Sequence, residues 1–296
     1  MDNELLLADR LGVIQTANKK YDLEHNAYLS FSGGKDSTIL HHLLDMALPN
    51  NKIPRVFINT GIEYLEIVKF VKELAKNDDR FVIIKPMKPI KQILETYGYP
   101  FKSKEHSLKV GQFQKGLISP NIEKYMRFGE QFACPKSLAY QFSKDFKLRL
   151  SNQCCYKLKK EPAHKWEKEN NRHIAITGLR REEGGQRANI KGCIITDNSG
   201  KVKKFHPLLV VSDEWEEWYR ERERVQLASL YYPPFNFKRS GCKGCPYAIN
   251  LQDQLTTMAI YLPQEREQCE WIWKPVYEEY RRIGYRLDKW EQMKLF

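Results

Sequence analysis

The sequence predicts an α/β protein, a doubly wound parallel sheet with a helical lobe that carries cysteines. Short apolar runs alternate with helix-like stretches through residues 27–97, the order that builds parallel sheets with right-handed crossovers. A glycine turn at residues 31–37 separates the first apolar run from a helix-like stretch. Two pairs of cysteines lie outside this alternation, at residues 154–155 and 242–245.

The first half of the chain supplies three of the expected strands. They are mostly apolar runs with the length of buried strands, residues 27–31, 55–59 and 81–85. Residues 65–76 carry apolar side chains at helical spacing, so we expect a helix there. Ligands bind beyond the carboxyl ends of parallel strands. We therefore expect the site at residues 32–37 and 59–61.

The second half is expected to complete the sheet and to add helices. Glycines and prolines predict a loop over residues 98–125, and residues 134–170 are expected to be helical and basic. Further strands are expected at the apolar residues 173–177 and 193–196. Residues 212–224 are predicted to form a helix, with Ser212 as its N-cap and acidic residues in the first turn.

The C-terminal part of the chain is expected to be a helical tail. A helix is predicted over residues 263–285. The side chains expected to pack against the body of the protein are Trp271, Trp273, Val276 and Tyr280. We therefore expect residues 1–250 to form the domain that carries the glycine turn and the cysteines, with residues 251–296 packed on it.

The glycine turn is the strongest functional signal in the chain. It consists of Ser32, Gly33, Gly34, Lys35, Asp36 and Ser37. Glycines let the backbone turn tightly and approach a ligand closely, and amides at a helix N-terminus attract an anion. The serine hydroxyls add donors and Lys35 adds a positive charge. The spacing differs from that of the common nucleotide P-loop, but the chemistry is that of a phosphate site.

The charge of the chain favours polyanionic partners. The 296 residues include 49 Lys or Arg and 37 Asp or Glu, a net charge of +12. Residues 101–170 hold 15 of the basic and only 7 of the acidic residues. Such a surplus suits nucleotides or a nucleic acid bound through its phosphates. The alternative interpretation is that the basic residues lie on solvated helix surfaces and bind no partner.

Targeting signals are not evident in the sequence. No apolar stretch approaches the roughly 20 residues that a membrane span needs. The acidic start, Met1 to Glu4, lacks the features of a secretory signal. We therefore expect a cytoplasmic protein with no membrane partner.

The cysteines point to a metal centre. Cys154 and Cys155 are adjacent, and Cys242 and Cys245 follow with 86 residues between the pairs. Four thiolates suit zinc or an iron–sulfur cluster. Adjacent side chains diverge and rarely reach one small ion, whereas a cluster offers a separate iron to each, so the spacing favours a [4Fe-4S] cluster. Unliganded buried cysteines are the alternative.

Several motifs resemble one known family. The turn resembles the PP-loop of the adenine nucleotide alpha hydrolases, and the cysteine pairs resemble those that hold a [4Fe-4S] cluster in adenylyl-sulfate reductases. The segment from Thr177 to Ala188 resembles the TGxRxxES…RA segment of the phosphoadenosine phosphosulfate (PAPS) reductase family. Lys204 to Leu208 resembles its K-x-N-P-L motif, with His206 in the Asn position. Residues 58–66 resemble its DTG…E segment, with Asn59 replacing the first acid.

The resemblance implies roles for particular residues. The PP-loop, with Thr60 and Gly61, would bind ATP, adenylyl sulfate or PAPS. Arg180 and Arg187 would bind phosphate or sulfate oxygens, because the planar guanidinium makes paired contacts with such groups. Lys35, Asp36 and Arg180 would be catalytic, and Asp36 is a candidate ligand for Mg²⁺. Lys159 matches the lysine of the CC-x-x-x-K motif, close to the cluster.

The chain departs from the family's reductases in one respect. Those enzymes carry a nucleophilic cysteine in a C-terminal tail, and residues 290–296 contain none. Cys269 is expected to be packed in a helix and Cys193 in the core. Cys134, beside a basic stretch, is the reserve candidate for a nucleophile.

Three functions are therefore open. In the first, the chain splits ATP to AMP and pyrophosphate in sulfur transfer to a nucleic acid, tRNA or DNA, with a sulfur donor as partner. In the second, it is an adenylyl-sulfate or PAPS reductase that uses another cysteine and a thioredoxin-like reductant. In the third, it is a regulatory protein that binds nucleotide and cluster without catalysis. The missing tail cysteine favours the first.

Overall fold

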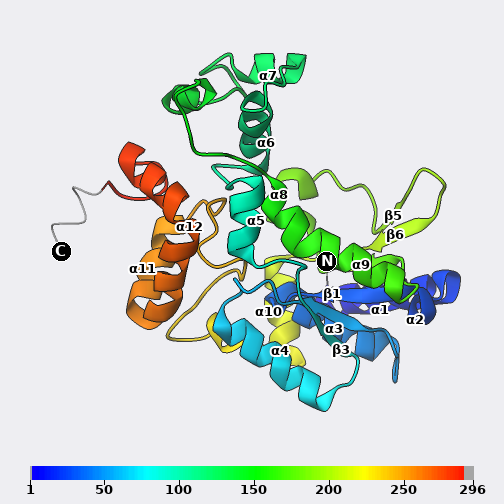
Figure 1. Ribbon diagram of the computed structural model, residues 1–296. Helices are drawn as coiled ribbons and strands as arrows, with labels where there is room; N and C mark the ends of the chain where they lie inside the picture. The colour runs from blue at the N-terminus through cyan, green and yellow to red at the C-terminus, as the bar shows by residue number, and fades with distance from the viewer. Residues whose placement is uncertain (1, 290–296) are drawn as a thin grey trace. The chain divides into compact units, whose positions relative to one another are not determined.

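The computed structural model describes residues 2–289 and contains one six-stranded sheet (Figure 1). The strands are β1 (Ala27–Phe31), β2 (Arg55–Ile58), β3 (Phe81–Ile84), β4 (Ile174–Ile176), β5 (Ile194–Thr196) and β6 (Val202–Phe205). They lie in the order β3-β2-β1-β4-β6-β5, and every neighbouring pair is parallel except β5 with β6. The predicted α/β class is confirmed, with one antiparallel strand at the edge.

The helices connect and follow the strands. The α-helices are α1 (Asn3–Tyr21), α2 (Leu23–Asn26), α3 (Lys35–Ala47), α4 (Leu65–Asn77), α5 (Ile90–Tyr97), α6 (Lys104–Phe113), α7 (Pro120–Tyr125), α8 (Gln153–Cys155), α9 (Glu161–Glu169), α10 (Asp213–Arg222), α11 (Leu251–Tyr261) and α12 (Pro263–Ile283). Short 3₁₀ turns are η1 (Lys136–Phe142), η3 (Arg181–Glu183), η4 (Gly185–Arg187) and η5 (Ser229–Tyr231), and η2 (Tyr156–Lys160) is a π-helical turn. Neither α1 nor β6 was predicted from the sequence.

The contacts within the chain divide it into two compact units. The first unit holds the residues up to Asn59, Glu63–Lys85 and Pro162–Ser240, and therefore the whole sheet. The second unit holds Thr60–Ile62, Pro86–Glu161 and the described residues from Gly241 onward, and is largely helical. The prediction that the chain divides at residue 250 stays a prediction.

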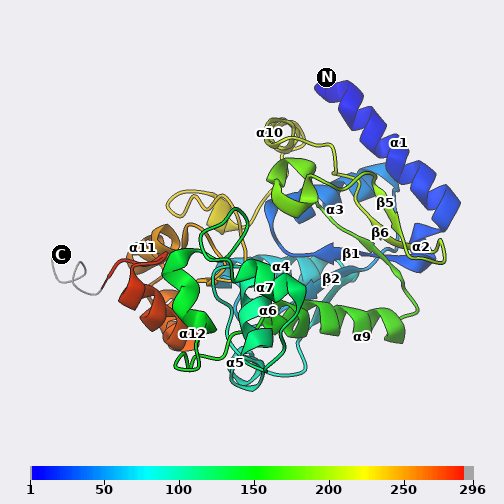
Figure 2. The ribbon, with the colours of Figure 1, turned by 90° about the horizontal axis from the view of Figure 1, so that it is seen from above.

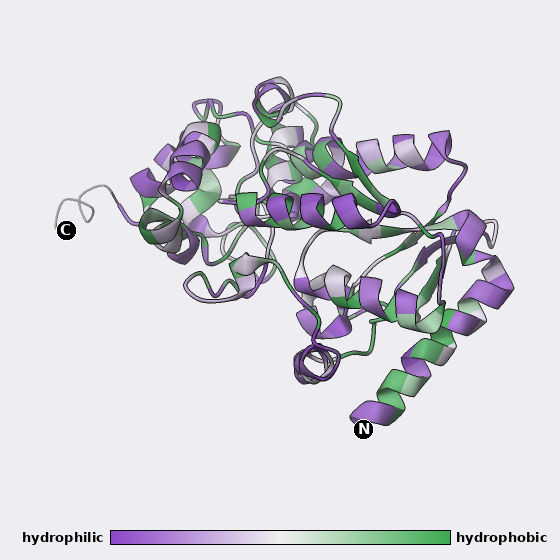
Figure 3. Cartoon of the chain, turned by 90° about the horizontal axis from the view of Figure 1, so that it is seen from below, coloured by the Kyte–Doolittle hydropathy of each residue, from purple (hydrophilic) through white to green (hydrophobic). Residues whose placement is uncertain are grey.

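Side chains on the two faces of the sheet pack against different helices. On one face, Tyr28 and Val56 form a buried cluster with Trp166 of α9. On the other face, the rings of Phe31 and Phe81 pack on each other at 5.0 Å and both approach His41 of α3. Strand residues alternate between faces, so α3 and α9 lie on opposite sides of the sheet (Figure 2). Figure 3 shows hydrophobic strands between helices whose outer faces are hydrophilic.

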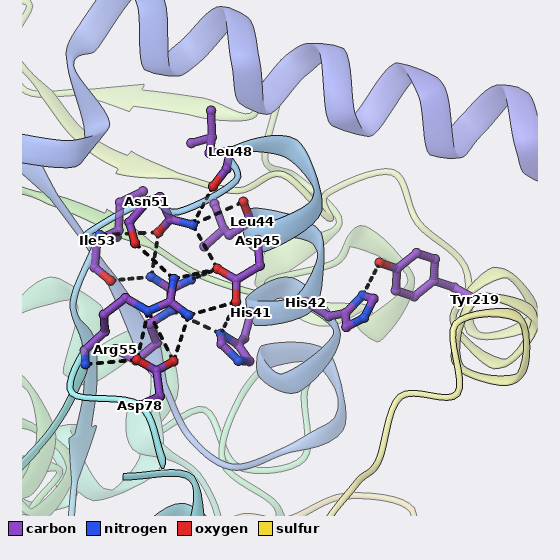
Figure 4. Close-up of polar contacts among 11 residues, drawn as sticks. His41, His42, Leu44, Asp45, Leu48, Asn51, Ile53, Arg55, Asp78 and Tyr219 are labelled. Atoms are coloured by element: carbon purple, nitrogen blue, oxygen red, sulfur yellow. Dashed lines mark hydrogen bonds and ion pairs between the residues drawn. The ribbon is translucent and has the colours of Figure 1, made fainter. Parts of the chain in front are cut away.

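An ion-pair network joins the start of β2 to α3 and to the turn before β3 (Figure 4). The Asp45 carboxylate accepts hydrogen bonds from Arg55 at 2.6 Å and from Arg80 at 2.7 Å. The Arg55 side chain is fully buried and also donates to the ring of His41 at 3.1 Å. Burial and the charge of Arg55 lower the pKa of His41 to about 4, so the ring is neutral at pH 7 and can accept this bond.

The structure corrects two sequence expectations in the second unit. Residues 98–125 are not a loop, because α6 and α7 lie within them. Gly111 lies inside α6, where the absence of a side chain lets the Leu150 backbone pack directly on the helix. A Cβ there would overlap the Leu150 carbonyl oxygen. Pro120 is the first residue of α7, a position where proline is tolerated because its missing N–H would have no partner. Residues 134–170 are only partly helical, because no helix lies between η1 and α8.

Three of the four side chains expected to anchor the last helix do so. Trp273, Val276 and Tyr280 of α12 are buried, but Trp271 is 57% exposed and was wrongly predicted to pack. The Lys91 ammonium lies 3.6 Å from the centre of the Trp271 ring, a cation–π contact that keeps the lysine charge in water. Among residues 2–289, every helix is too short or too polar to cross a bilayer.

We predict that Asp45→Asn lowers the free energy of unfolding by roughly 2 kcal/mol, because it leaves the buried Arg55 without its carboxylate. The measurement is urea unfolding near pH 7. Glu73→Gln is the matched control, since the side chains of Glu73 and Lys76 are 64% and 70% exposed and such pairs contribute about 0.5 kcal/mol or less. Equal effects of the two substitutions would contradict a structural role for the network.

Candidate functional site

The glycine turn joins β1 to α3 in the first unit. Gly33 has φ +70°, a conformation that favours glycine, and a Cβ there would lie 2.7 Å from Ile67 Cγ2 of α4. Gly34 is the N-cap of α3, and Lys35 begins the helix. The turn therefore has the predicted order of strand, glycines and helix N-terminus. Glycine is required at position 33 both for its conformation and for the space it leaves to α4.

The two serines of the turn bond within it. Ser37 Oγ accepts from Ser32 N at 3.2 Å and donates to the Gly34 carbonyl at 3.0 Å. The two serine hydroxyls lie 3.0 Å apart. These bonds fix the shape of the turn.

A tyrosine hydroxyl covers the start of α3. Tyr231 Oη accepts a hydrogen bond from Lys35 N at 3.3 Å and donates one to Ser240 Oγ at 2.5 Å. A Cβ at Gly34 would lie 2.9 Å from Ser240 Oγ and 3.3 Å from Tyr231 Oη. Neither Tyr231 nor Ser240 was singled out in the sequence. Their oxygens occupy positions beside the helix N-terminus where anionic oxygens are favoured.

Arg180 follows β4 and reaches the same turn. Its side chain is almost fully buried, and its Nε donates to Asp36 Oδ1 at 2.9 Å. One Nη donates to Asp213 Oδ1 of α10 at 2.6 Å, and the other lies 3.3 Å from Glu182. Gly178 precedes it, and a Cβ there would lie 2.9 Å from the Asp36 backbone. The glycine thus lets the Thr177–Arg180 segment lie directly on the start of α3.

Glu216 of α10 lies under these cations and is completely buried. Its Oε2 is 3.0 Å from Lys35 Nζ and 3.3 Å from an Nη of Arg180. Within the described chain, neither carboxylate oxygen has a well-aligned hydrogen bond, so these are charge contacts. Burial and the charge of the Asp36 carboxylate together raise the pKa of Glu216 to about 8, although the charges of Arg180 and Lys35 act to lower it.

The site has more carboxylates than cations. Lys35 also approaches Asp213, at 3.4 Å, so each of its two carboxylate contacts is shared with Arg180. The pKa of Lys35 is raised, because the attraction of Glu216 and Asp213 outweighs its burial. Nucleotide phosphates that bind here must replace some of these ion pairs or bring a cation with them.

The other residues expected at the nucleotide site make other contacts or belong to the other unit. Arg187 is half-exposed and pairs with Glu183, so the structure places it in a separate ion pair. Thr60 and Gly61 follow the carboxyl end of β2 and belong to the second unit. Their part in nucleotide binding stays a prediction, as does that of Arg187.

His206, in the motif that follows β6, contacts the segment that carries Arg180. Its Nδ1 lies 2.7 Å from Thr177 Oγ1, and its side chain is buried. Burial lowers the pKa of His206 to about 4, so the ring is neutral at pH 7. A neutral imidazole can make the same side-chain hydrogen bond as the asparagine that it replaces in the motif.

The four cysteines of the two pairs all belong to the second unit. Cys154 and Cys155 lie in α8, with their sulfurs 4.0 Å apart. The pKa of Cys154 is raised by the bond to Cys155, by burial and by the charges of Cys155, Cys245 and Cys242. Burial and the charge of Cys242 raise the pKa of Cys245 to about 12. The four thiols are therefore close enough to oppose one another's ionisation.

Helix α12 holds the loop that carries the second cysteine pair. Trp273 Nε1 donates to the Lys243 carbonyl at 3.3 Å, and the Tyr277 hydroxyl donates to the carbonyl of Gly244. Gly244 has φ +59°, and a Cβ there would lie 2.5 Å from Tyr277 Oη, so the loop passes closely over the helix. The buried ammonium of Lys243 pairs with Glu265 at 3.1 Å. The predicted C-terminal helix thus shapes the Cys242–Cys245 loop.

These cysteines fit a cluster better than a single ion. Among residues 2–289, no three His, Cys, Asp or Glu side chains are arranged to hold one metal ion. A [4Fe-4S] cluster takes one thiolate at each of four irons, so its ligands need not converge on one point. Gathered, partly buried thiols become stable thiolates only beside a compensating positive charge. The donor set therefore fits such a cluster.

The other cysteines are poor nucleophiles or lie apart. Cys134 was predicted as the reserve nucleophile, but it is completely buried and burial raises its pKa to about 11, which corrects that expectation. Cys269 is completely buried in α12, and burial raises its pKa to about 12. Cys193 is only half-buried and precedes β5, so it is not the core residue expected, and Arg10 approaches its sulfur at 3.8 Å.

The family of the chain follows from comparison with known domains. The model of the phosphoadenosine phosphosulfate reductase domain matches residues 26–127 and 124–248. The chain belongs to this family. The matched residues include the glycine turn, the Arg180 segment and all four cysteines of the two pairs. The resemblance read from the motifs is confirmed at the level of the family.

Individual relatives are distant. An uncharacterized protein of Methanocaldococcus jannaschii is 34% identical over 85 residues, which are 29% of this chain and 19% of that protein. The chain thus matches about a fifth of that relative's length. The PAPS reductase of Candida auris has 17% identity and a TM-score of 0.45, covering 77% of this chain and 87% of its own. The U34-tRNA thiolase of Methanococcus maripaludis, solved with its [4Fe-4S] cluster, has 12% identity and a TM-score of 0.42. The match covers 97% of this chain and 82% of the thiolase chain.

The residues of α10 are the part of the site that the motifs did not reveal. Asp213 and Glu216 contact both cations of the turn. One signal was present in the sequence. Trp215 and Tyr219 are four apart and mark the buried face of the helix, and Glu216 lies next to Trp215 on it. A carboxylate at a buried helix position needs a cation, and Lys35 and Arg180 are the cations it meets.

We predict that Glu216 makes the stability of this PAPS reductase family member depend on pH. Its pKa is raised in the folded state, so the folded protein holds this proton more tightly than the unfolded chain does. Its contribution to stability is therefore full below about pH 4.5 and is lost as the pH rises toward 8. The free energy of unfolding of the wild type relative to Glu216→Gln should fall by more than ~1 kcal/mol over this range.

Urea unfolding at pH 5, 6.5 and 8 measures this difference. Glu217→Gln is the matched control, because Glu217 is the next residue of α10, is half-exposed and pairs with Arg220. The ion pair with Arg220 lowers the pKa of Glu217, so this control should show no loss between pH 5 and 8. The prediction would be contradicted if the free energy of unfolding of the wild type, relative to Glu216→Gln, increased with pH. That result would mean that the attraction of Lys35 and Arg180 for the Glu216 carboxylate exceeds the cost of its burial.

Proposed function

We propose that this chain is a PP-loop enzyme that binds an adenine nucleotide at residues 32–37 and cleaves ATP to AMP and pyrophosphate in sulfur transfer. The observation that carries the proposal is that the Lys35 and Arg180 side chains share two carboxylates at a helix N-terminus shaped by two glycines. Backbone amides and two cations at one turn favour the negative charge that develops on a leaving pyrophosphate.

Each group at the turn has a role in this reaction. An oxygen of the acceptor attacks the α-phosphorus of ATP, and the bond from that phosphorus to pyrophosphate breaks. Lys35 and Arg180 would stabilise the departing oxygens, and Asp36 would hold a Mg²⁺ ion that accompanies the phosphates. The sulfur of a donor at the oxidation level of hydrosulfide then displaces AMP from the acceptor. The expected acceptor is a nucleic acid, tRNA or DNA.

We further propose that Cys154, Cys155, Cys242 and Cys245 hold a [4Fe-4S] cluster. When bound, such a cluster would supply electron-transfer capacity or a structural and electrostatic centre, because four cysteine ligands leave no iron open to bind sulfur. The chain's own contribution is to hold two cysteines in α8 and to fix the loop of the other two against α12 through Trp273 and Tyr277. The same contacts would persist without the cluster, because they involve only backbone carbonyls and α12 side chains.

Family membership favours a second candidate, the reduction of adenylyl sulfate or PAPS to sulfite. That reaction needs a thiolate that attacks sulfur, and thiolates form where the pKa of a cysteine is lowered. Outside the two cysteine pairs, Cys134 and Cys269 are completely buried and have raised pKa values. This is why we prefer ATP cleavage.

The experiment that separates the two reactions follows both sets of products under anaerobic conditions. We expect AMP and pyrophosphate from ATP when tRNA or DNA is present, and no sulfite from adenylyl sulfate or PAPS with thioredoxin. Lys35→Ala should lower ATP cleavage by about 100-fold or more, because it removes a cation from the leaving group. Lys76→Ala, a lysine whose side chain is 70% exposed, is the matched control. Sulfite release at enzymatic rates would make the chain a reductase.

A separate prediction concerns the cysteines. Protein purified without oxygen should be brown and contain about four irons per chain, and Cys242→Ser should lose most of this iron and colour. Cys193→Ser is the control, because Cys193 belongs to the first unit. Iron content and the visible absorption spectrum are the measurements. A colourless wild type with one zinc per chain would contradict the cluster and leave the nucleotide site untouched.

A further inference from the structure

An open cavity lies beside the first cysteine pair, within the second unit. Its volume is about 350 Å³, and its lining consists of Lys104, Asn152, Gln153, Cys155, Tyr156 and Lys160. Two of these side chains are ammonium groups, and two are amides that can donate hydrogen bonds. The lining contains no carboxylate. A cavity with hydrogen-bond donors and two ammonium groups but no carboxylate suits an anion.

The two lysines of the cavity are available to a ligand. In the part of the chain that the structure describes, neither Lys104 nor Lys160 has an ion-pair partner, whereas nearby Lys157 is paired with Glu161. Both lysines are exposed. Both lysines line the same volume as Cys155. Their charges therefore act on one small volume from two segments, the start of α6 and the turn after α8.

A π-helical turn brings the cavity residues of the second segment together. In η2 the Glu161 N–H donates to the Tyr156 carbonyl, which lies five residues earlier in the chain. In an α-helix the N–H donates to the carbonyl four residues earlier. The wider turn places Lys160 on the same side as Cys155 and Tyr156, and all three line the cavity. Single π turns inside helices occur often at functional sites, because they cost backbone stability to redirect side chains.

The aromatic ring at the cavity defines the ligand further. Tyr156 is 44% exposed, although an aromatic ring gains free energy from burial. Exposed rings beside lysines are the surface on which unpaired bases stack while their phosphates meet the cations. The surrounding residues 101–170 carry the basic surplus of the chain, 15 basic against 7 acidic residues.

We propose that this cavity binds a nucleotide unit, with its phosphate on Lys104, Lys160 and the amides of Asn152 and Gln153, and its base on the Tyr156 ring. The unit can belong to a single-stranded nucleic acid or be a free mononucleotide. It is a second nucleotide site, separate from the PP-loop. The inference deepens the proposed function, because it names the surface that receives an acceptor strand, but it concerns binding alone.

The test is fluorescence anisotropy with full-length protein purified anaerobically and labelled 12-residue RNA and DNA oligonucleotides. Lys104→Ala with Lys160→Ala should weaken binding by about tenfold or more, and should reduce the slope of log affinity against log salt by about 1.4. Lys144→Ala with Lys147→Ala is the matched control, because it removes the same charge from exposed lysines of the same basic region outside the cavity lining. Equal losses in the two double variants would overturn the proposal.

The ring is tested separately. Tyr156→Ala should weaken strand binding by about tenfold, and Tyr156→Phe should bind as the wild type does, because stacking needs the ring and not the hydroxyl. If both variants lost strand binding, or if neither did, the proposed stacking of a base on the Tyr156 ring would be overturned. Iron content and visible spectra of each variant show whether the cysteines are undisturbed.

Competition identifies the source of the nucleotide unit. AMP that displaces the oligonucleotide from the wild type at micromolar concentration would indicate a mononucleotide site, and displacement only by unlabelled strands would indicate a nucleic-acid site. Failure of the wild type to bind either class would overturn the proposal. Lys35→Ala should keep strand binding, so a failure of ATP cleavage and a failure of this site are seen in different measurements.

Discussion

The arrangement of the nucleotide site depends on one buried guanidinium. Arg180 contacts Asp36 at the start of α3, Asp213 and Glu216 of α10, and Glu182 in its own segment. Because the guanidinium has five donors in a rigid plane, it fixes the directions of these segments as well as their distance. Gly178 allows the approach, and Glu216 places Lys35 beside it. Without this side chain, these four carboxyl groups would be left with Lys35 as the cation that contacts two of them.

Much of the fold was predictable because its signals are local. The strands at 27–31, 55–58 and 81–84 and helix α4 lie where apolar periodicity placed them. The errors have a physical cause. Gly111 and Pro120 indicated a loop, but one leaves space for a carbonyl and the other occupies a helix position that tolerates proline. Residue type alone does not distinguish a glycine that turns the chain from one that lets it pack closely.

The site was predictable only where its residues form contiguous motifs. The glycine turn and Arg180 could be read from the sequence, and the structure brings them together through Asp36. Glu216 and Tyr231 could not, because their roles come from burial and from contacts across nearly 200 positions of sequence. The cysteines were predicted as two pairs, but the packing of the second pair on α12 depends on carbonyls that every residue has. Such contacts leave no signature in side-chain chemistry.

The internal ion pairs of the turn have a consequence for selectivity. Lys35 and Arg180 already share Asp213 and Glu216, and Tyr231 already accepts from the amide of Lys35. A small monovalent anion such as chloride can replace only one of these contacts, so the protein's own oxygens compete with it successfully. A chain of phosphates can engage the amide and both cations at once. Under the proposed function, these internal contacts would favour a ligand with several anionic oxygens over a monoanion.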